Sequence, residues 1–207
     1  MTTPIKSSYA RLAALLWLAS TAGCAAAIEP ADTDDGEAQA QEAALSQCPP
    51  EVPQNLAVPE GNRLAFSFDA VGEQLYVCQQ TATGYGWVFR APVADLFKPN
   101  GNIAGTHYVG PTWEALDGST VVGARVDGFA ADPTAIPWLL LRAVSNSEDG
   151  RMSKVSFIHR LDTAGGLAPV SGCDADHVNQ VQGVDYTAVY YFYVPSSGSP
   201  QGPDCEP

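Results

Sequence analysis

From about residue 52 onward, short runs of β-branched and aromatic residues alternate with Gly, Pro and Asn-Gly turn signals. Such side chains fit the surface of a pleated sheet, whereas Gly, Pro and Asn interrupt strands. No long amphipathic helical pattern competes with this alternation. It predicts an all-β fold, with a single β-sandwich as the preferred alternative and a small barrel-like domain as the other.

The expected strands each lie between two turn signals. They cover residues 64–68, 74–79, 86–91, 106–109, 112–115, 120–126, 138–144, 154–161 and 184–194. A single helical turn is expected over residues 92–96. No internal repeat is visible.

Side chains alternate across a strand, so two of the expected strands can be divided into faces. Both faces of the last strand are apolar or aromatic, which predicts a central strand covered on both sides: Tyr186, Ala188, Tyr190 and Phe192 on one face, Thr187, Val189, Tyr191 and Tyr193 on the other. Its tyrosines either pack in the core or form a stacking platform for a sugar or aromatic ligand. In residues 154–161, the side chains expected to face the core are Val155, Phe157, His159 and Leu161, with Lys154, Ser156, Ile158 and Arg160 facing away. His159 is interpreted as a buried histidine with satisfied hydrogen bonds.

The first 23 residues have the three parts of an export signal. Lys6 and Arg11 form the positive end, residues 12–22 form an apolar run, and small residues precede Cys24. The run is shorter than the roughly 20 apolar residues of a spanning helix. The end of this segment resembles a bacterial lipobox, with Thr21 in place of the usual Leu. It predicts a lipoprotein-type signal peptide over residues 1–23 and lipidation at Cys24. The alternative is ordinary cleavage after residues 25–27, which releases a free secreted protein.

Residues 24–51 are rich in Ala, Glu, Asp, Gln and Pro. Such a stretch buries too little apolar surface to offset the entropy of ordering it, so it is interpreted as a flexible acidic tether. Residues 52–207 then have the size of one β domain.

Four cysteines follow Cys24, at Cys48, Cys78, Cys173 and Cys205. An even number in an exported chain predicts disulfide bonds, for which three pairings are possible. Cys48–Cys205 with Cys78–Cys173 is preferred, because the first pair lies at the two ends of the folded part. No Cys-x-x-Cys or close Cys/His spacing is present, so zinc is not expected.

The formal net charge of −13 restricts the partners. Nucleic acid is excluded, because phosphate binding depends on Lys and Arg. Contact with a membrane is expected only through the N-terminal lipid. A small molecule, a glycan or an envelope protein remains as the partner. The expected location is the bacterial outer membrane, or the periplasmic or extracellular face, as a lipoprotein; otherwise the protein is secreted.

One expected hairpin, over residues 107–119, combines side chains that carry chemistry: His107, Trp113, Glu114 and Asp117. A histidine beside a carboxylate can serve general acid–base catalysis, or the four can line a polar pocket. The alternative is purely structural, with Gly110-Pro111 and Asp117-Gly118 forming turns and Trp113 filling the core.

Other catalytic or cofactor signatures are missing from the sequence, including the Gly-x-Ser-x-Gly elbow, the His-Glu-x-x-His motif and the phosphate and dinucleotide loops. Asp174, Asp176 and His177 are too few to predict a metal site. No metal and no cofactor is therefore expected.

Several segments follow one another in an order that resembles a known family: 72–78 (GEQLYVC), 107–114 (HYVGPTWE), 117–119 (DGS), 136–141 (IPWLLL), 160–166 (RLDTAGG) and 186–190 (YTAVY). This is a family of secreted bacterial and fungal proteins catalogued as domain of unknown function 3455, and the resemblance covers roughly residues 58–194. It implies an exported single domain and carries no activity, cofactor or catalytic residue. His159 stands where the family more often has Gln, which argues against a general catalytic role.

The expected function is therefore that of an exported, lipid-anchored β domain acting as a binding or envelope-associated module. The alternative is a hydrolase-like enzyme that uses His107, Glu114 and Asp117 beside Trp113. A pocket joining His107 to a carboxylate would favour the enzyme, whereas an exposed aromatic strip would favour the binding module.

Overall fold

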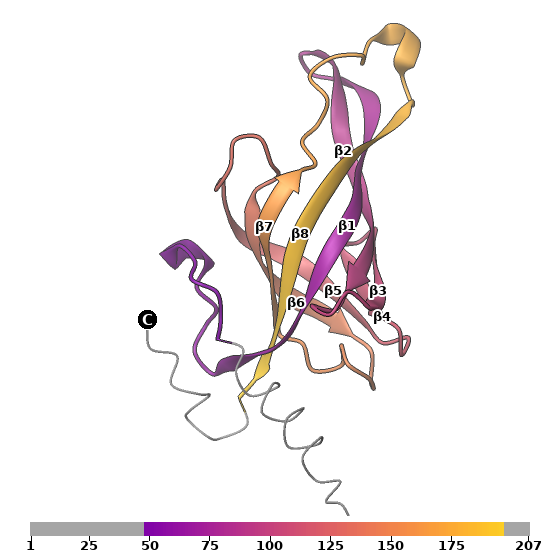
Figure 1. Cartoon of the computed structure of the whole chain (residues 1–207). Coiled ribbons are helices and arrows are strands. Elements are labelled where there is room, and N and C mark those ends of the chain that lie inside the picture. Colours follow the sequence, from indigo (N-terminus) through magenta and orange to yellow (C-terminus); the bar gives the residue numbers. More distant parts are fainter. Residues whose placement is uncertain (1–47, 197–207) are drawn as a thin grey trace, which may run out of the picture.

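The computed structural model describes residues 48–196, so the predicted signal peptide, Cys24, most of the tether and Cys205 lie outside the described residues. Within this range, eight antiparallel strands pair in sequence order and close into a barrel, because β8 pairs back onto β1 (Figure 1). The strands are β1 (Asn62–Thr81), β2 (Gly84–Phe97), β3 (Ile103–Tyr108), β4 (Thr112–Ala115), β5 (Thr120–Phe129), β6 (Trp138–Asn146), β7 (Phe157–Gly165) and β8 (Val181–Pro195). Two short 3-10 helices are η1 (Gln54–Leu56) and η2 (Ala175–His177). The all-β prediction is confirmed, and the barrel is the one of its two alternatives that forms.

β1 joins two strands that the sequence pattern had separated at Gly72. A side chain at Gly72 would meet the backbone carbonyl of Val93 in β2. The glycine therefore marks a close crossing of two strands rather than a break between them.

The helical turn expected over residues 92–96 is wrong, because these residues belong to β2. Pro92 pairs with Gln74 of β1, and the pairing of β2 with β3 covers only residues from Ala94 onward. On its β3 side, Pro92 therefore has no paired strand that would need a backbone N–H donor. Proline, which lacks this N–H, is tolerated at such a position.

The predicted faces are reversed within β7, although Val155, just before this strand, lies in the core as expected. Ile158 belongs to the barrel core and Arg160 lines its interior, whereas His159 and Leu161 lie on the outer face. The outer face is apolar because the segment around η1 covers it, with Leu56 packed between Leu140 and Leu161. The alternation of side chains along a strand shows that its two faces differ. When both faces are covered by other residues, the alternation does not show which face points into the barrel.

His159 has the structural role that its surroundings predicted. It is buried, its Nε2 lies 2.7 Å from the carbonyl oxygen of Leu56, and its Nδ1 lies 3.1 Å from the hydroxyl of Tyr193. These contacts attach the segment before β1 to the outside of the barrel.

The barrel interior is filled with side chains at one end. Phe66, Phe68 and Phe192 form an aromatic cluster there, with ring centroids 4.8–5.6 Å apart. The connection between β6 and β7 contributes Met152 to the same core cluster, where it is fully buried. In β8, the face carrying Tyr186, Ala188, Tyr190 and Phe192 lies in the core. The other face, which was expected to be covered too, is covered only in part, because Tyr193 is buried and Thr187 is exposed.

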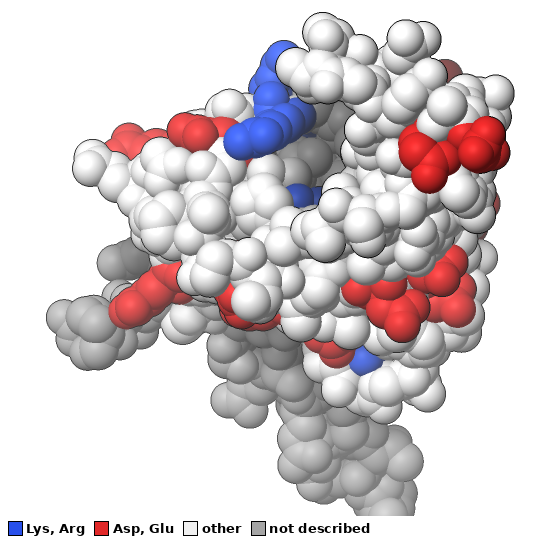
Figure 2. Space-filling view, turned by 90° about the horizontal axis from the view of Figure 1, so that it is seen from above, with Lys and Arg blue, Asp and Glu red and all other residues white. Residues whose placement is uncertain are grey.

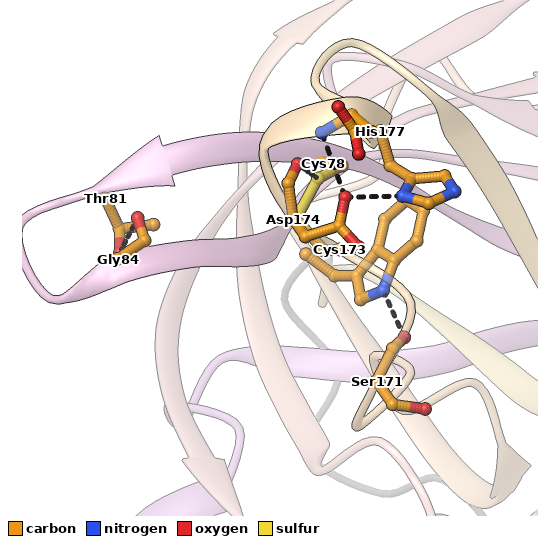
Figure 3. Close-up of a disulfide and its surroundings, with 9 residues drawn as sticks. Cys78, Thr81, Gly84, Ser171, Cys173, Asp174 and His177 are labelled. Atoms are coloured by element: carbon orange, nitrogen blue, oxygen red, sulfur yellow. Dashed lines mark hydrogen bonds and ion pairs between the residues drawn. A yellow bond between two sulfur atoms is a disulfide. The ribbon is translucent and has the colours of Figure 1, made fainter.

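The other end of the barrel carries the long β1–β2 hairpin, which a disulfide ties to the β7–β8 connection (Figure 3). Cys78 and Cys173 form this bond, which confirms one of the two preferred pairs. The indole Nε1 of Trp87 donates a hydrogen bond of 2.8 Å to the carbonyl of Ser171 in the same connection. Cys48 is also disulfide-bonded. Its pairing with Cys205 stays a prediction, since Cys205 lies outside the described residues.

The disulfide is consistent with an oxidising, exported environment. In the part of the chain that the structure covers, no helix has the length and apolar character needed to span a membrane.

Candidate ligand-binding cavity

The barrel interior is hollow at the end opposite the phenylalanine cluster, where a cavity of about 320 Å³ remains. Its wall is largely apolar and aromatic, with Phe89, Trp113, Leu139, Leu141 and Tyr190 among the lining residues. Figure 2 looks onto this end of the molecule and shows a hollow with blue Lys and Arg side chains at its rim and inside it. The cavity takes up space that side chains fill in the rest of the barrel.

Two residues of the predicted hairpin, His107 and Trp113, lie side by side on this wall. They are directly opposite each other in the β3–β4 register, so both point into the barrel. Their rings stack, with centroids 4.4 Å apart and planes inclined by 11°. The ring of Tyr190 meets both edge-on, at 5.0 Å from His107 and 5.2 Å from Trp113. The three rings form one continuous aromatic wall.

His107 is neutral in this position. Burial lowers its pKa to about 3, and the nearby positive charge of Arg160 acts in the same direction, while a hydrogen bond to Thr112 opposes them. Nδ1 lies 2.8 Å from the carbonyl oxygen of Thr112, so Nδ1 carries the proton and donates it. Nε2 is then a hydrogen-bond acceptor rather than an acid.

Arg160 brings a positive charge into the barrel. Its Nε and Nη2 both donate to the carbonyl oxygen of Pro137, at 3.2 and 2.8 Å. Burial lowers its pKa, but a guanidinium in a protein stays protonated. Among residues 48–196 the one ion pair is His177–Asp174, so no carboxylate in this part of the chain pairs with Arg160.

Two tyrosine hydroxyls lie close to Arg160. The hydroxyls of Tyr186 and Tyr190 are 3.5 Å apart, and both side chains are buried. Burial raises the pKa of each phenol, while the charge of Arg160 lowers it in part. Both phenols are therefore protonated at neutral pH and cannot neutralise Arg160.

Two buried donors at the cavity have no hydrogen-bond partner: Nε2 of Gln74 and Nε1 of Trp113. The two side chains are 2% and 1% exposed, respectively. A buried donor without a partner costs about 1–3 kcal/mol, so these atoms are the least satisfied polar groups of the wall. Both side chains line the cavity, although the two nitrogen atoms themselves are covered by neighbouring atoms.

The charges around the cavity have one sign. Arg90, Arg125 and Arg160 are among its lining residues, and the lining contains neither Asp nor Glu. Arg90 and Arg125 are exposed, whereas Arg160 is mostly covered. In a chain with a net charge of −13, this concentration of positive charge is unusual.

The two predicted carboxylates lie elsewhere. Glu114 is opposite Thr106 in the β3–β4 register, on the outer face, and its Oε2 accepts a hydrogen bond of 2.8 Å from the hydroxyl of Tyr108. Asp117 lies in the β4–β5 turn, where it accepts hydrogen bonds from Ser119 and from the backbone of Arg151. These bonds lower the pKa of Asp117 to about 2. The structure thus brings His107 and Trp113 together and separates both carboxylates from them.

The acidic segment after Cys173 forms a local turn. The carboxylate of Asp174 accepts hydrogen bonds from the backbone of Asp176 and from Nδ1 of His177, the latter at 2.6 Å (Figure 3). The described residues contain no group of three or more His, Cys, Asp or Glu side chains arranged to hold a metal ion.

Sequence reasoning missed the residues that give the cavity its polarity, Gln74 and Arg160. Gln74 interrupts an apolar alternation in β1, and this signal alone could have marked it. Arg160 was placed on the solvent side because the apolar residues beside it were assigned to the barrel interior.

The comparisons with known proteins agree with the family resemblance. The family model described as "Protein of unknown function (DUF3455)" matches residues 98–194, a shorter stretch than the expected 58–194. The match includes His107, Trp113 and Arg160 but not Gln74. No curated protein and no solved structure matches the chain. Over β3 to β8, the chain is therefore similar to the family described as protein of unknown function DUF3455.

Proposed function

We propose that this protein is an exported binding module whose barrel takes up one small organic molecule with an apolar body. The observation that carries the proposal is the cavity of about 320 Å³, which has a largely apolar wall and a few convergent polar groups. Ligand sites commonly combine these properties, and the mouths of β-barrels are among their usual places. An eight-stranded barrel has room for one small ligand.

The hydrolase alternative has less support. General acid–base catalysis needs a titratable group within hydrogen-bond reach of its partner. Neither Glu114 nor Asp117 shares a hydrogen bond with His107, and the low pKa of His107 makes it a poor proton carrier at neutral pH. Binding without chemical conversion is the function that this geometry supports best.

Export and anchoring are part of the proposal. The Cys78–Cys173 disulfide supports an oxidising compartment, and the lipobox-like segment before Cys24 supports attachment through an N-terminal lipid. A tether of about the length of residues 24–51 would hold the barrel away from the membrane surface. The membrane face itself would repel the acidic body.

The test is a titration with N-phenyl-1-naphthylamine, an uncharged dye whose fluorescence rises in apolar surroundings. We expect saturable binding at one site per protein. Leu139→Trp, which fills the cavity from β6, should weaken binding at least tenfold. The matched control is Leu116→Trp, because Leu116 lies 66% exposed in the β4–β5 turn and is not among the cavity-lining residues. The control should bind like the wild type. Absence of saturable binding, or equal binding by both variants, would contradict the proposal.

A further inference from the structure

The most unusual feature of the cavity is a positive charge that has no negative partner. Arg160 lines the barrel interior, and no carboxylate within residues 48–196 forms an ion pair with it. Burying a charge is costly unless it is paired and hydrogen-bonded. An arginine at this position adds little to the stability of the fold. Its presence points to a negatively charged ligand that binds from solution.

The contacts of Arg160 leave part of its guanidinium available. The carbonyl oxygen of Pro137 accepts from both Nε and Nη2 and so holds the plane of the group in place. The hydroxyl of Tyr190 is a further hydrogen-bond partner of the guanidinium. An arginine has five N–H donors, which is more than these contacts use. A fixed guanidinium with unused donors suits a carboxylate, whose two oxygens can accept two parallel hydrogen bonds.

Two further donors lie on the same cavity wall. Nε2 of Gln74 and Nε1 of Trp113 are buried without partners, and they come from different strands, β1 and β4. Together with Arg160, they make three side chains that all need acceptors. Their coincidence at one cavity indicates the polar end of a ligand that is rich in acceptor oxygens.

The other residues that line the cavity favour an anionic ligand over a neutral one. Arg90 and Arg125 add positive charge to the lining, and no acidic side chain opposes it. Cavities with one sign of charge concentrate ligands of the opposite sign. Phe89 and Leu139 add accessible apolar surface to the lining beside the stacked rings. This surface suits the body of an organic acid better than an inorganic anion.

We infer that the ligand is a small organic carboxylate, with its acid group held by Arg160, Gln74 and Trp113 and its apolar body against the aromatic wall. This inference rests on the proposed function and specifies its ligand class. The carboxylate would neutralise the mostly covered guanidinium and bring acceptor oxygens to the part of the wall that holds the two unpartnered donors.

Calorimetric titration with matched acid and amide pairs tests the inference. The probes are indole-3-acetate with indole-3-acetamide, and octanoate with octanamide. The two members of each pair have nearly the same shape and differ in the charge and hydrogen-bonding groups of the head. We expect the acid to bind at least tenfold more tightly than its amide in at least one pair. Because an arginine does not lose its proton in this range, affinity should fall only as pH drops through the pKa of the ligand itself.

Variants test whether the preference for the acid over the amide depends on the residues proposed to hold the carboxylate. Arg160→Gln should reduce the acid-over-amide preference to twofold or less. Arg142→Gln is the matched control, since Arg142 is exposed on β6 outside the cavity and the change in net charge is the same. Trp113→Phe and Gln74→Met should each lower the preference severalfold. If circular dichroism shows that Arg160→Gln does not fold, these two variants provide the test instead.

The outcomes separate the inference from the proposed function. If the naphthylamine dye binds in the cavity but neither acid binds better than its amide, the carboxylate inference fails and the binding function stands. A preference that survives in Arg160→Gln also overturns the inference. If neither the dye nor any acid or amide binds, the proposed function fails as well.

Discussion

The imidazole of His107 stacks on the indole of Trp113, with ring centroids 4.4 Å apart, and its proton is held by the carbonyl of Thr112. The pair forms part of a cavity wall inside the barrel. A histidine held in this way acts as a flat, neutral ring. This arrangement explains why a motif that looks suited to acid–base chemistry instead forms part of the cavity wall.

Stability should depend on pH through His107. Its pKa is about 3 in the folded protein and near 6.5 when unfolded, so the unfolded chain binds the extra proton between these values. The contribution of His107 to stability is therefore complete above about pH 6.5 and is lost as pH falls toward 3. The free energy of unfolding should drop by about 1.4 kcal/mol per pH unit between pH 6 and 4 from this residue.

His107→Phe removes this contribution and keeps a ring against Trp113. Urea unfolding at pH 7, 6, 5 and 4 should show the wild type losing its advantage over the variant as the solution becomes more acidic. Parallel pH profiles for the two proteins would show that His107 is not held neutral.

Replacing Gln74 should stabilise the protein while weakening ligand binding. Gln74→Met removes the buried Nε2 donor that has no partner and keeps the side-chain volume similar, so we expect the free energy of unfolding to rise by about 1 kcal/mol. Gln79→Met is the control on the same strand, because Gln79 is exposed, and its effect should stay within about 0.5 kcal/mol. Chemical denaturation measures both. A clear loss of stability in Gln74→Met would mean that Nε2 is already satisfied.

The Cys78–Cys173 disulfide should contribute substantially to stability, because it joins residues 95 positions apart. Replacing both cysteines with Ala is expected to cost about 2–4 kcal/mol, mainly through the greater freedom of the unfolded chain. Urea unfolding of the variant and the wild type measures the difference, and peptide mapping without reductant should recover the linked peptides. Two alkylatable thiols at these positions in the native exported protein would disprove the bond.

Membrane attachment should depend on Cys24. If the lipobox-like segment is processed as predicted, the native protein partitions with membranes, and Cys24→Ser blocks its processing or releases it. Cell fractionation followed by immunoblotting distinguishes the two proteins. Equal recovery of both in the soluble fraction would end the lipoprotein hypothesis and leave the barrel a free secreted domain.

Local sequence patterns were enough to predict the class of fold and the positions of most strands. Residues 112–115 were predicted with the observed bounds of β4, since turn residues frame that strand closely. The Cys78–Cys173 pair also followed from export, an even number of cysteines, and the position of Cys48 and Cys205 at the two ends of the folded part. These predictions depend on the properties of neighbouring residues or on counting, which a sequence displays directly.

The polar end of the cavity was decided by tertiary structure. Whether Arg160 points into the barrel depends on which face of β7 the segment around Leu56 covers, and that packing joins residues about a hundred positions apart. The position of Glu114 also depends on tertiary structure. The β3–β4 register pairs Trp113 with His107, so Glu114, the next residue, points to the opposite face of the sheet. The sequence by itself determined that this region forms strands and that two pleated faces must differ. Only closure of the barrel decided which face became the cavity wall, because burial on both sides of a strand removes the polarity signal that would distinguish inside from outside.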